Sequence, residues 1–207
     1  LVHVGGRYEG PGARQIDGSN SMVSPGLVNI HSHPLSEPLN KGFLDELGSP
    51  ALYMSSLYEY MPLFGTSGEG TQACTQVAYS ELLQSGVTTL VDLSVVYDGW
   101  LDLLAQSGLR GIVAPMYRSA SWGTTDGHVV HYDWKPQDGE RAMADALGFI
   151  DRATAHESGR ITGMVAPSQI DTCTPELIRD SHAEARRRGV PMQIHAAQSV
   201  VEFHEIT

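Results

Sequence analysis

The chain has 207 residues, 41% of them hydrophobic, which is enough to build one sizeable core. Its formal net charge of −11 argues against nucleic acid as a partner, because binding to phosphates requires a basic surface. We expect neither a membrane span nor a signal peptide, since no apolar run has the length or flanking charges that these need. Cys74 and Cys173 lie far apart without CxxC spacing, so we predict free thiols in a cytoplasmic protein.

Short apolar runs alternate with amphipathic stretches after Pro25, and glycines follow the ends of most amphipathic stretches. In chain order the predicted elements are strand 27–30, helix 68–85, strand 87–91, helix 100–107, strand 111–114, helix 138–158, strand 161–166, helix 175–188 and strand 191–195. Residues 1–22 are polar and Gly-rich, and are too few to fold alone. We expect them to be the tail of a unit that begins upstream.

Strand–helix alternation at this spacing predicts a parallel sheet, either doubly wound or closed into a barrel. No Gly-rich phosphate loop is present, which argues against a nucleotide-binding sheet. Histidines at the ends of predicted strands favour a barrel, because functional residues collect at the C-terminal face of that fold. Five strands cannot close an eight-stranded barrel. We therefore predict an α/β fold that is part of a (β/α)8 TIM-like barrel, strands 1–5, within a longer polypeptide.

Two histidines, His31 and His33, follow the first predicted strand. Side chains two residues apart on a strand point the same way, so both imidazoles can face one point at the mouth of the barrel. Two neutral imidazoles with a shared direction are the beginning of a divalent-metal site.

The frame around these histidines, from Val23 to Pro34, resembles the first-strand signature of the amidohydrolase superfamily of metal-dependent hydrolases. Residues 85–92, 166–177 and 193–197 resemble its second strand, its fourth strand and helix, and its fifth strand. Together they look most similar to the cytosine deaminase and triazine hydrolase branch. The resemblance implies that residues 1–22 are the tail of a small N-terminal β-sandwich domain. It also implies that residues 23–207 form the first five β/α units of the barrel.

The resemblance implies three metal ligands in this chain: His31, His33 and His195. A histidine after strand six and an aspartate after strand eight would complete the set outside it. Without the resemblance, His195 could equally be a buried histidine bonded to the backbone. Two-metal members of the superfamily usually bridge their ions with a carboxylated lysine at the end of strand four. This chain has only Lys41 and Lys135, neither of which lies there, so we expect one divalent ion, Zn²⁺ by preference, with Co, Mn or Fe as alternatives.

A metal-activated water would attack the substrate, with His195 and Gln198 as the catalytic residues of this chain. Deaminases of the branch carry a glutamate three residues after the fifth-strand histidine, where this sequence has Gln198. An amide forms hydrogen bonds but does not exchange a proton. We therefore predict hydrolysis of a C–N or C–S bond in a small amide, urea or (thio)carbamate-like substrate, as in phenylurea hydrolases and molinate hydrolase, which the loop at 34–42 resembles. Glu202 could supply the missing acid, but a solvated helix glutamate is the simpler interpretation.

Four residues form the predicted substrate-binding set: Tyr58, Asp92, Trp122 and Gln198. Tyr58 belongs to the aromatic and Met-rich segment 53–64, which could either wall the active site or simply pack on the barrel. Trp122 belongs to residues 117–134, a segment long enough to be a functional loop over the site. Asp92, at the end of the second strand, could also support a ligand histidine.

Two alternatives stay open beside the main hypothesis. One is a deaminase or dechlorinase of a nitrogen heterocycle, and the other is a metal-free scaffold member of the superfamily. The expected partners are a small-molecule substrate, the remainder of the same barrel and further copies of the chain in a homo-oligomer.

Overall fold

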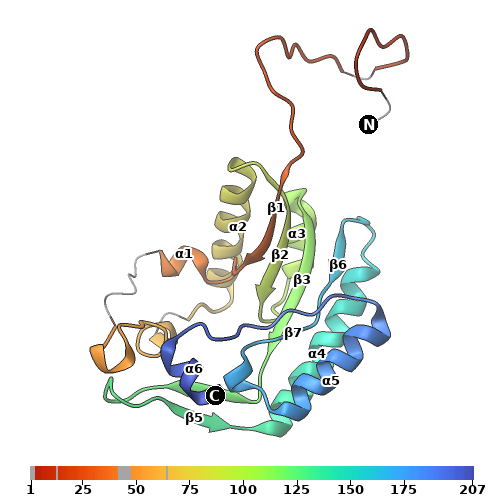
Figure 1. Cartoon of the computed structure of the whole chain (residues 1–207). Helices are drawn as coiled ribbons and strands as arrows, with labels where there is room; N and C mark the ends of the chain where they lie inside the picture. The colour runs from red at the N-terminus through yellow and green to blue at the C-terminus, as the bar shows by residue number, and fades with distance from the viewer. Residues whose placement is uncertain (1–2, 13, 42–47, 64) are drawn as a thin grey trace.

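The computed structural model describes residues 3–12, 14–41, 48–63 and 65–207. Its centre is a parallel sheet in the order β1–β2–β3–β6, and a short strand β7 pairs farther along β3 (Figure 1). These strands are β1 (Leu27–Ser32), β2 (Val87–Ser94), β3 (Arg110–Tyr117), β6 (Ile161–Gly163) and β7 (Ala166–Pro167). The parallel order follows the chain order, as the α/β barrel prediction requires.

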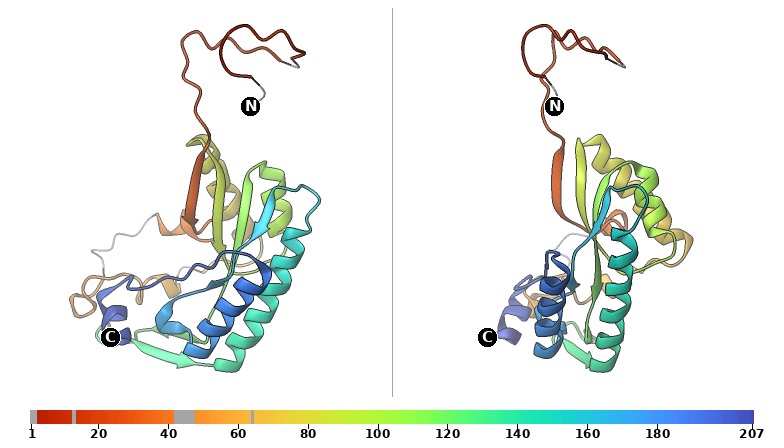
Figure 2. Two further views of the ribbon diagram at one scale, coloured as in Figure 1. Left: turned by 45° about the vertical axis from the view of Figure 1, so that its right-hand side comes forward. Right: turned by 90° about the vertical axis from the view of Figure 1, so that its right-hand side faces the viewer.

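Three helices lie along one side of this sheet: α2 (Glu69–Gln84), α3 (Trp100–Ser107) and α4 (Pro136–Thr154), as Figures 1 and 2 show. The helix α5 (Pro175–Arg188) packs against α4 and β7. One core cluster joins β2, β3, α3 and α4 around Trp100, Leu104 and Phe149. Parallel strands connected by helices on one side confirm the predicted α/β fold, which is part of a (β/α)8 barrel.

Local sequence signals set the limits of two of these helices. The helix α3 lies between Gly99 and Gly108, whose φ angles of 84° and 80° are in the left-handed region that favours glycine. The helix α5 begins after Thr174, whose side chain accepts a hydrogen bond from the backbone N–H of Leu177. It ends at Arg188, and Gly189 directly after it has φ 67°. Both helices therefore occupy the predicted residues.

The fourth and fifth predicted strands differ from their prediction. Residues 161–166 divide into β6 and β7, because the N–H of Val165 turns away from β3 and donates to the carbonyl of Pro191. Residues 191–195 form no continuous ladder; two isolated parallel bridges, Val165 to Met192 and Gln169 to His195, hold them beside β6 and β7. The fifth segment still runs in the predicted place and direction.

The segment 117–134, which the sequence predicts to be a functional loop, contains a hairpin over residues 120–134. Its strands β4 (Ala120–Gly123) and β5 (His131–Trp134) pair antiparallel, from Ala120 opposite Trp134 to Gly123 opposite His131. The remaining elements are short: α1 (Glu37–Asn40), η2 (Pro50–Leu52), η3 (Met61–Leu63), η4 (Ile170–Thr172) and α6 (Val200–Ile206).

The described part of residues 3–26 contains no helix or strand and extends away from the sheet (Figures 1 and 2). The β-sandwich assignment of residues 1–22 therefore stays a prediction. Cys74 and Cys173 are buried free thiols, as predicted. Among the described residues, no helix combines the length and apolar character needed to cross a membrane.

Candidate metal centre

The two histidines of the first strand lie at its carboxyl end and turn to the same side. Ser32, between them, points the other way: it is buried, and its hydroxyl donates to the carbonyl of Val91 at 2.8 Å. The Nδ1 of His33 donates to the carbonyl of Leu93, also on β2, at 2.9 Å. The alternation of a β-strand thus separates a structural serine from two imidazoles at the mouth of the sheet.

The third histidine, His195, comes from the segment beside β7. Its backbone N–H donates to the carbonyl of Ser168 at 3.1 Å, and its own carbonyl accepts the N–H of Ile170 at 3.0 Å. Its Nδ1 also donates to the Ser168 carbonyl, at 2.6 Å. The alternative interpretation of His195, a ring hydrogen-bonded to the backbone, is correct for Nδ1. This bond occupies only one of the two ring nitrogens and leaves Nε2 free of it.

The free nitrogens of the three rings converge. The Nε2 of His33 lies 3.1 Å from that of His31 and 3.3 Å from that of His195. One ligand atom from each of the three residues lies within 4.8 Å of the other two. No other group of three such side chains meets this criterion in the described ranges.

This arrangement fits a bound cation. The rings of His33 and His195 each donate Nδ1–H to a carbonyl, so each carries its proton there and presents a lone pair at Nε2. Two lone pairs 3.3 Å apart repel one another unless a positive charge lies between them. A tetrahedral zinc ion with Zn–N bonds of about 2.0–2.1 Å holds its ligand nitrogens roughly 3.3 Å apart. The donor set and its spacing therefore suit a divalent metal.

The surroundings also favour neutral rings for His31 and His33, as metal ligands must be. Burial is the largest cause that lowers the pKa of His33 to about 4, with His195 and His31 adding to the effect. Burial and the nearby His195 lower the pKa of His31 as well. The two rings of the first strand are thus neutral in preference to imidazolium.

A tight turn follows His195 and carries Gln198. Ala197 in this turn has φ 53°, in the left-handed region that costs energy for a residue with a side chain. The Gln198 side chain is exposed, while its backbone N–H donates to Oε2 of Glu202 at 2.7 Å. The interpretation of Glu202 as a solvated helix glutamate is therefore wrong, because the residue is fully buried. Burial is the main cause that raises its pKa.

Tyr58 and Trp122 lie next to each other, with ring centroids 5.3 Å apart in a T-shaped arrangement. Tyr58 is 1% exposed, and its hydroxyl is hydrogen-bonded to that of Ser199 at 2.7 Å. The guanidinium of Arg118 lies 5.6 Å from the centre of the Trp122 ring. The two predicted aromatic residues therefore connect the segment after β1, the hairpin and the turn after His195. Phe64, at the end of the 53–64 segment, lies outside the described residues.

Besides the Tyr58–Trp122 contact, the hairpin has a second contact, which the sequence did not predict. The hydroxyl of Tyr132 on β5 donates to Oδ2 of Asp171 in η4 at 2.8 Å. Asp171 is buried, and its desolvation raises its pKa. No local motif indicated this pair, which forms only when residues 39 positions apart meet in the fold. His128 and His131 of the same hairpin are exposed and outside the histidine cluster.

Asp92 lies elsewhere than predicted. It is fully buried, and its carboxylate accepts hydrogen bonds from Tyr79 at 2.5 Å, Ser94 at 2.6 Å and Trp100 at 2.8 Å. Tyr79 and Trp100 belong to α2 and α3, so the carboxylate anchors these helices to the sheet. The geometry supports neither substrate binding nor support of a ligand histidine by Asp92.

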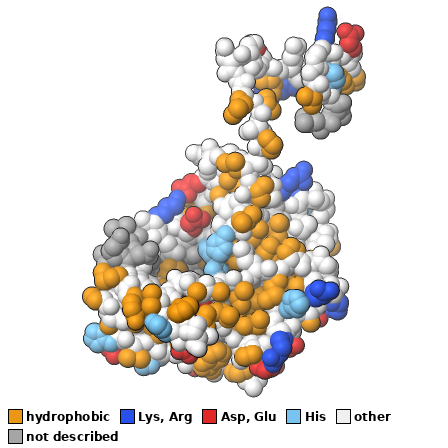
Figure 3. Space-filling model, viewed as in Figure 1, with side chains coloured by type: hydrophobic (Ala, Val, Ile, Leu, Met, Phe, Trp, Pro, Cys, Tyr) orange, Lys and Arg blue, Asp and Glu red, His pale blue; other side chains and the backbone are white. Residues whose placement is uncertain are grey.

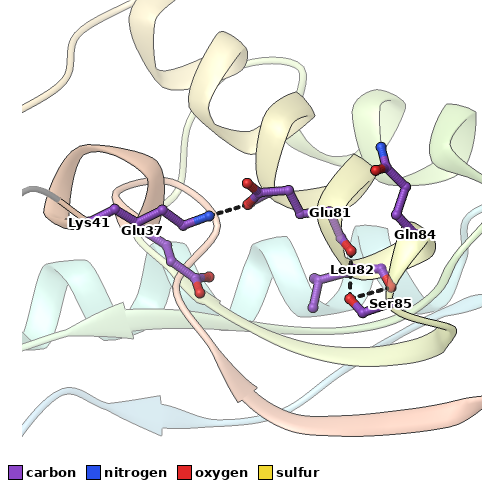
Figure 4. Close-up of a pocket in the computed structure, with 7 residues that line it drawn as sticks. Glu37, Lys41, Glu81, Leu82, Gln84 and Ser85 are labelled. Atoms are coloured by element: carbon purple, nitrogen blue, oxygen red, sulfur yellow. Dashed lines mark hydrogen bonds and ion pairs between the residues drawn. The ribbon is translucent and has the colours of Figure 1, made fainter.

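The two lysines are also away from the cluster. Lys41 pairs with Glu81 at a depression between α1 and α2, whose lining Figure 4 shows and which contains no histidine. Lys135 pairs with Asp133 and is exposed. Neither is placed to bridge two metal ions.

The fold and this cluster define a class: a (β/α)8 barrel, present here in part, with imidazoles gathered at the carboxyl ends of its strands. The chain belongs to the amidohydrolase family, whose model matches residues 22–205. It is 30% identical over 188 residues to the 5-methylthioadenosine/S-adenosylhomocysteine deaminase of Carboxydothermus hydrogenoformans, covering 91% of this chain and 40% of that protein. The chain thus spans less than half the length of this relative.

Solved structures share the fold. The adenosine deaminase from Xanthomonas campestris, with bound zinc, has a TM-score of 0.67 at 20% identity, over 87% of this chain and 38% of that one. The triazine hydrolase from Arthrobacter aurescens has a TM-score of 0.58 at 21% identity, over 83% and 40%. The resemblance to the amidohydrolases is confirmed, and the suggested branch is consistent with these neighbours.

Proposed function

We propose that the protein is a mononuclear metal-dependent hydrolase that cleaves a C–N bond in a small molecule. The observation that carries this proposal is the convergence of three Nε2 atoms from His31, His33 and His195 at the carboxyl ends of the strands. These three imidazoles would hold a divalent metal, with zinc as first choice, which would lower the pKa of a water to about 7 and polarise the scissile group. The position of both lysines away from the cluster supports a single ion.

The residues of this chain have separate tasks in the proposed reaction. The Nδ1 bonds of His33 and His195 to backbone carbonyls fix the ring orientations, so that both Nε2 atoms stay available to the metal. The exposed Gln198 amide, three residues after His195, binds the substrate by hydrogen bonds. Trp122 forms part of the wall beside the substrate, and the buried Tyr58 ring packs edge-to-face against it.

Proton transfer distinguishes between substrate classes. Gln198 cannot protonate a ring nitrogen, and one oxygen of Glu202 is committed to a backbone N–H. Hydrolysis of an amide, urea or carbamate-like carbonyl does not require ring protonation, and this favours such a substrate. The second candidate is deamination of a nitrogen heterocycle, which the name of the relative from Carboxydothermus supports.

The edge of the sheet at β1 exposes apolar side chains, which supports the interpretation that further strands of the barrel pack there. Leu27, Val28 and Ile30 of the edge strand β1 are 59%, 61% and 69% exposed, and hydrophobic side chains gather on this face of the molecule (Figure 3). We propose that the remainder of the same barrel covers them and supplies further ligands and the general base. The predicted homo-oligomer and cytoplasmic location stay predictions.

The test uses the full-length protein. Elemental analysis should find about one equivalent of metal per chain, and H195A should lose it. A panel of ureas, carbamates, amides and aminoheterocycles is then assayed for released amine and, separately, for ammonia. Amine release supports the first candidate and ammonia release the second. Turnover that survives in metal-free protein would contradict both, and H182A, which changes an exposed histidine of α5, is the matched control.

A further inference from the structure

Glu202 is a charged side chain in an unusual place. It is the third residue of α6, it has no exposed surface, and its Oε2 accepts the N–H of Gln198 at 2.7 Å. Its Oε1 is buried and has no hydrogen-bond partner among the described residues. Burying a carboxylate costs free energy of folding, so a glutamate at this buried position calls for a role other than exposure to solvent.

The side-chain hydrogen bond of Glu202 and the cap at its backbone N–H both concern one turn. Ser199 caps α6 by accepting the backbone N–H of Glu202 at 3.1 Å, and Glu202 reaches back to Gln198, so the two form a capping arrangement. The turn that it closes contains Ala197 in its left-handed conformation and begins directly after His195. A strained backbone of this kind persists only where its surroundings hold it.

We propose that Glu202 is a positioning residue, whose carboxylate holds the turn after His195 and so sets where the Gln198 amide meets the substrate. The inference rests on the proposed function, because the role of Gln198 is part of it. Glu202 does not replace the acid found in deaminases, since its Oε2 faces a backbone N–H inside the turn and its Oε1 is buried away from solvent. Its hydrogen bond acts on the backbone of Gln198, whose side chain remains exposed.

Two substitutions separate positioning from proton transfer. In E202Q, the amide oxygen still accepts the Gln198 N–H but the side chain cannot exchange a proton, whereas E202A removes the acceptor. E205A, at an exposed glutamate of the same helix, is the control. The first readout is hydrogen exchange at the Gln198 amide, which needs no substrate. Metal content and the separate values of kcat and KM are the others.

We expect exchange at the Gln198 amide to become roughly tenfold faster or more in E202A, and to stay within about threefold of the wild type in E202Q and E205A. With a substrate found as above, kcat/KM should fall about 10- to 100-fold in E202A at unchanged metal content. E202Q should retain most of it. Unchanged exchange in E202A would overturn the proposal. So would an E202Q protein as inactive as E202A with its Gln198 amide still protected, since that pattern indicates proton transfer.

A third variant keeps the test decisive if E202A fails to fold. A197G lowers the cost of the left-handed backbone, so the double variant A197G/E202A should recover part of the lost protection and activity. No recovery in a folded double variant would also contradict the proposal. If the proposed function were wrong instead, the wild-type protein would bind no metal and show no turnover, while its Gln198 amide would still be protected from exchange.

Discussion

Metal binding should stabilise this fold through His195, and removing that ring should abolish the effect with little cost to the metal-free protein. In H195A, two of the three converging nitrogens remain, 3.1 Å apart. The lost ring also gives up its Nδ1 bond to the Ser168 carbonyl, at 2.6 Å. That carbonyl still accepts the backbone N–H of residue 195, so it is not left unsatisfied.

These contacts set the expected sizes. One hydrogen bond to a carbonyl contributes about 0.5–1.5 kcal/mol, and loss of the lone-pair repulsion at Nε2 offsets part of it in the metal-free protein. A metal at one hundred times its Kd stabilises the wild type by about 2.7 kcal/mol. For a domain of 150–250 residues that corresponds to a rise in Tm of roughly 5–11 °C, and the rise is smaller in proportion for a longer cooperative unit. We expect this rise in the wild type and almost none in H195A.

The assay is thermal unfolding of the full-length protein after treatment with a chelator, with and without added zinc. H182A is the control, because its histidine lies exposed on α5 and outside the cluster. An H195A protein that gains as much Tm from zinc as the wild type would refute the ligand assignment. If magnesium stabilised the wild type and H195A equally and zinc stabilised neither, the bound ion would lie outside the histidine cluster.

Three further predictions concern the sheet and the turn. Burial raises the pKa of Asp92 to about 6, so its contribution to the stability of the metal-free protein is present below pH 3.8 and is lost as the pH rises through 6. D92N should remove this loss, which is on the order of 3 kcal/mol, and urea unfolding from pH 4 to 8 of both proteins measures the difference. In G111A, a Cβ would meet Leu104 Cδ2 at 2.3 Å in a buried position, so urea unfolding should show a loss of about 1–3 kcal/mol in the free energy of unfolding. Because the Gln198 side chain is exposed, Q198E should keep fold and metal content, and should raise ammonia release from aminoheterocycles relative to amine release in the paired product assay.

The site could be predicted where a local rule decides the outcome. Strand alternation was sufficient to place His31 and His33 on one side, with Ser32 opposite. The prediction for Asp92 failed because β2 is buried along most of its length on both faces, so hydrophobic periodicity does not tell which way a polar side chain points. Its partners come from two helices, and only the packed structure brings them to one carboxylate.

Glu202 is an intermediate case. The sequence Ser199–Glu202 has the S-x-x-E spacing of a capping box, which indicates a helix start and a glutamate turned back toward the chain. That signal was available and would have opposed the solvated interpretation. Full burial of the side chain depends instead on α6 packing against η4, a contact between segments that no local pattern describes.

The register between β1 and β2 connects these observations to the histidine cluster. Ser32 and His33 each donate a side-chain hydrogen bond to a carbonyl of β2, at Val91 and Leu93. A slip of one residue would break both bonds and turn the histidine pair to the opposite face. On the same strand, Asp92 ties α2 and α3 to the sheet through Tyr79 and Trp100. The aspartate makes no contact with the histidine cluster, but it helps to fix β2, the strand whose Leu93 carbonyl orients His33.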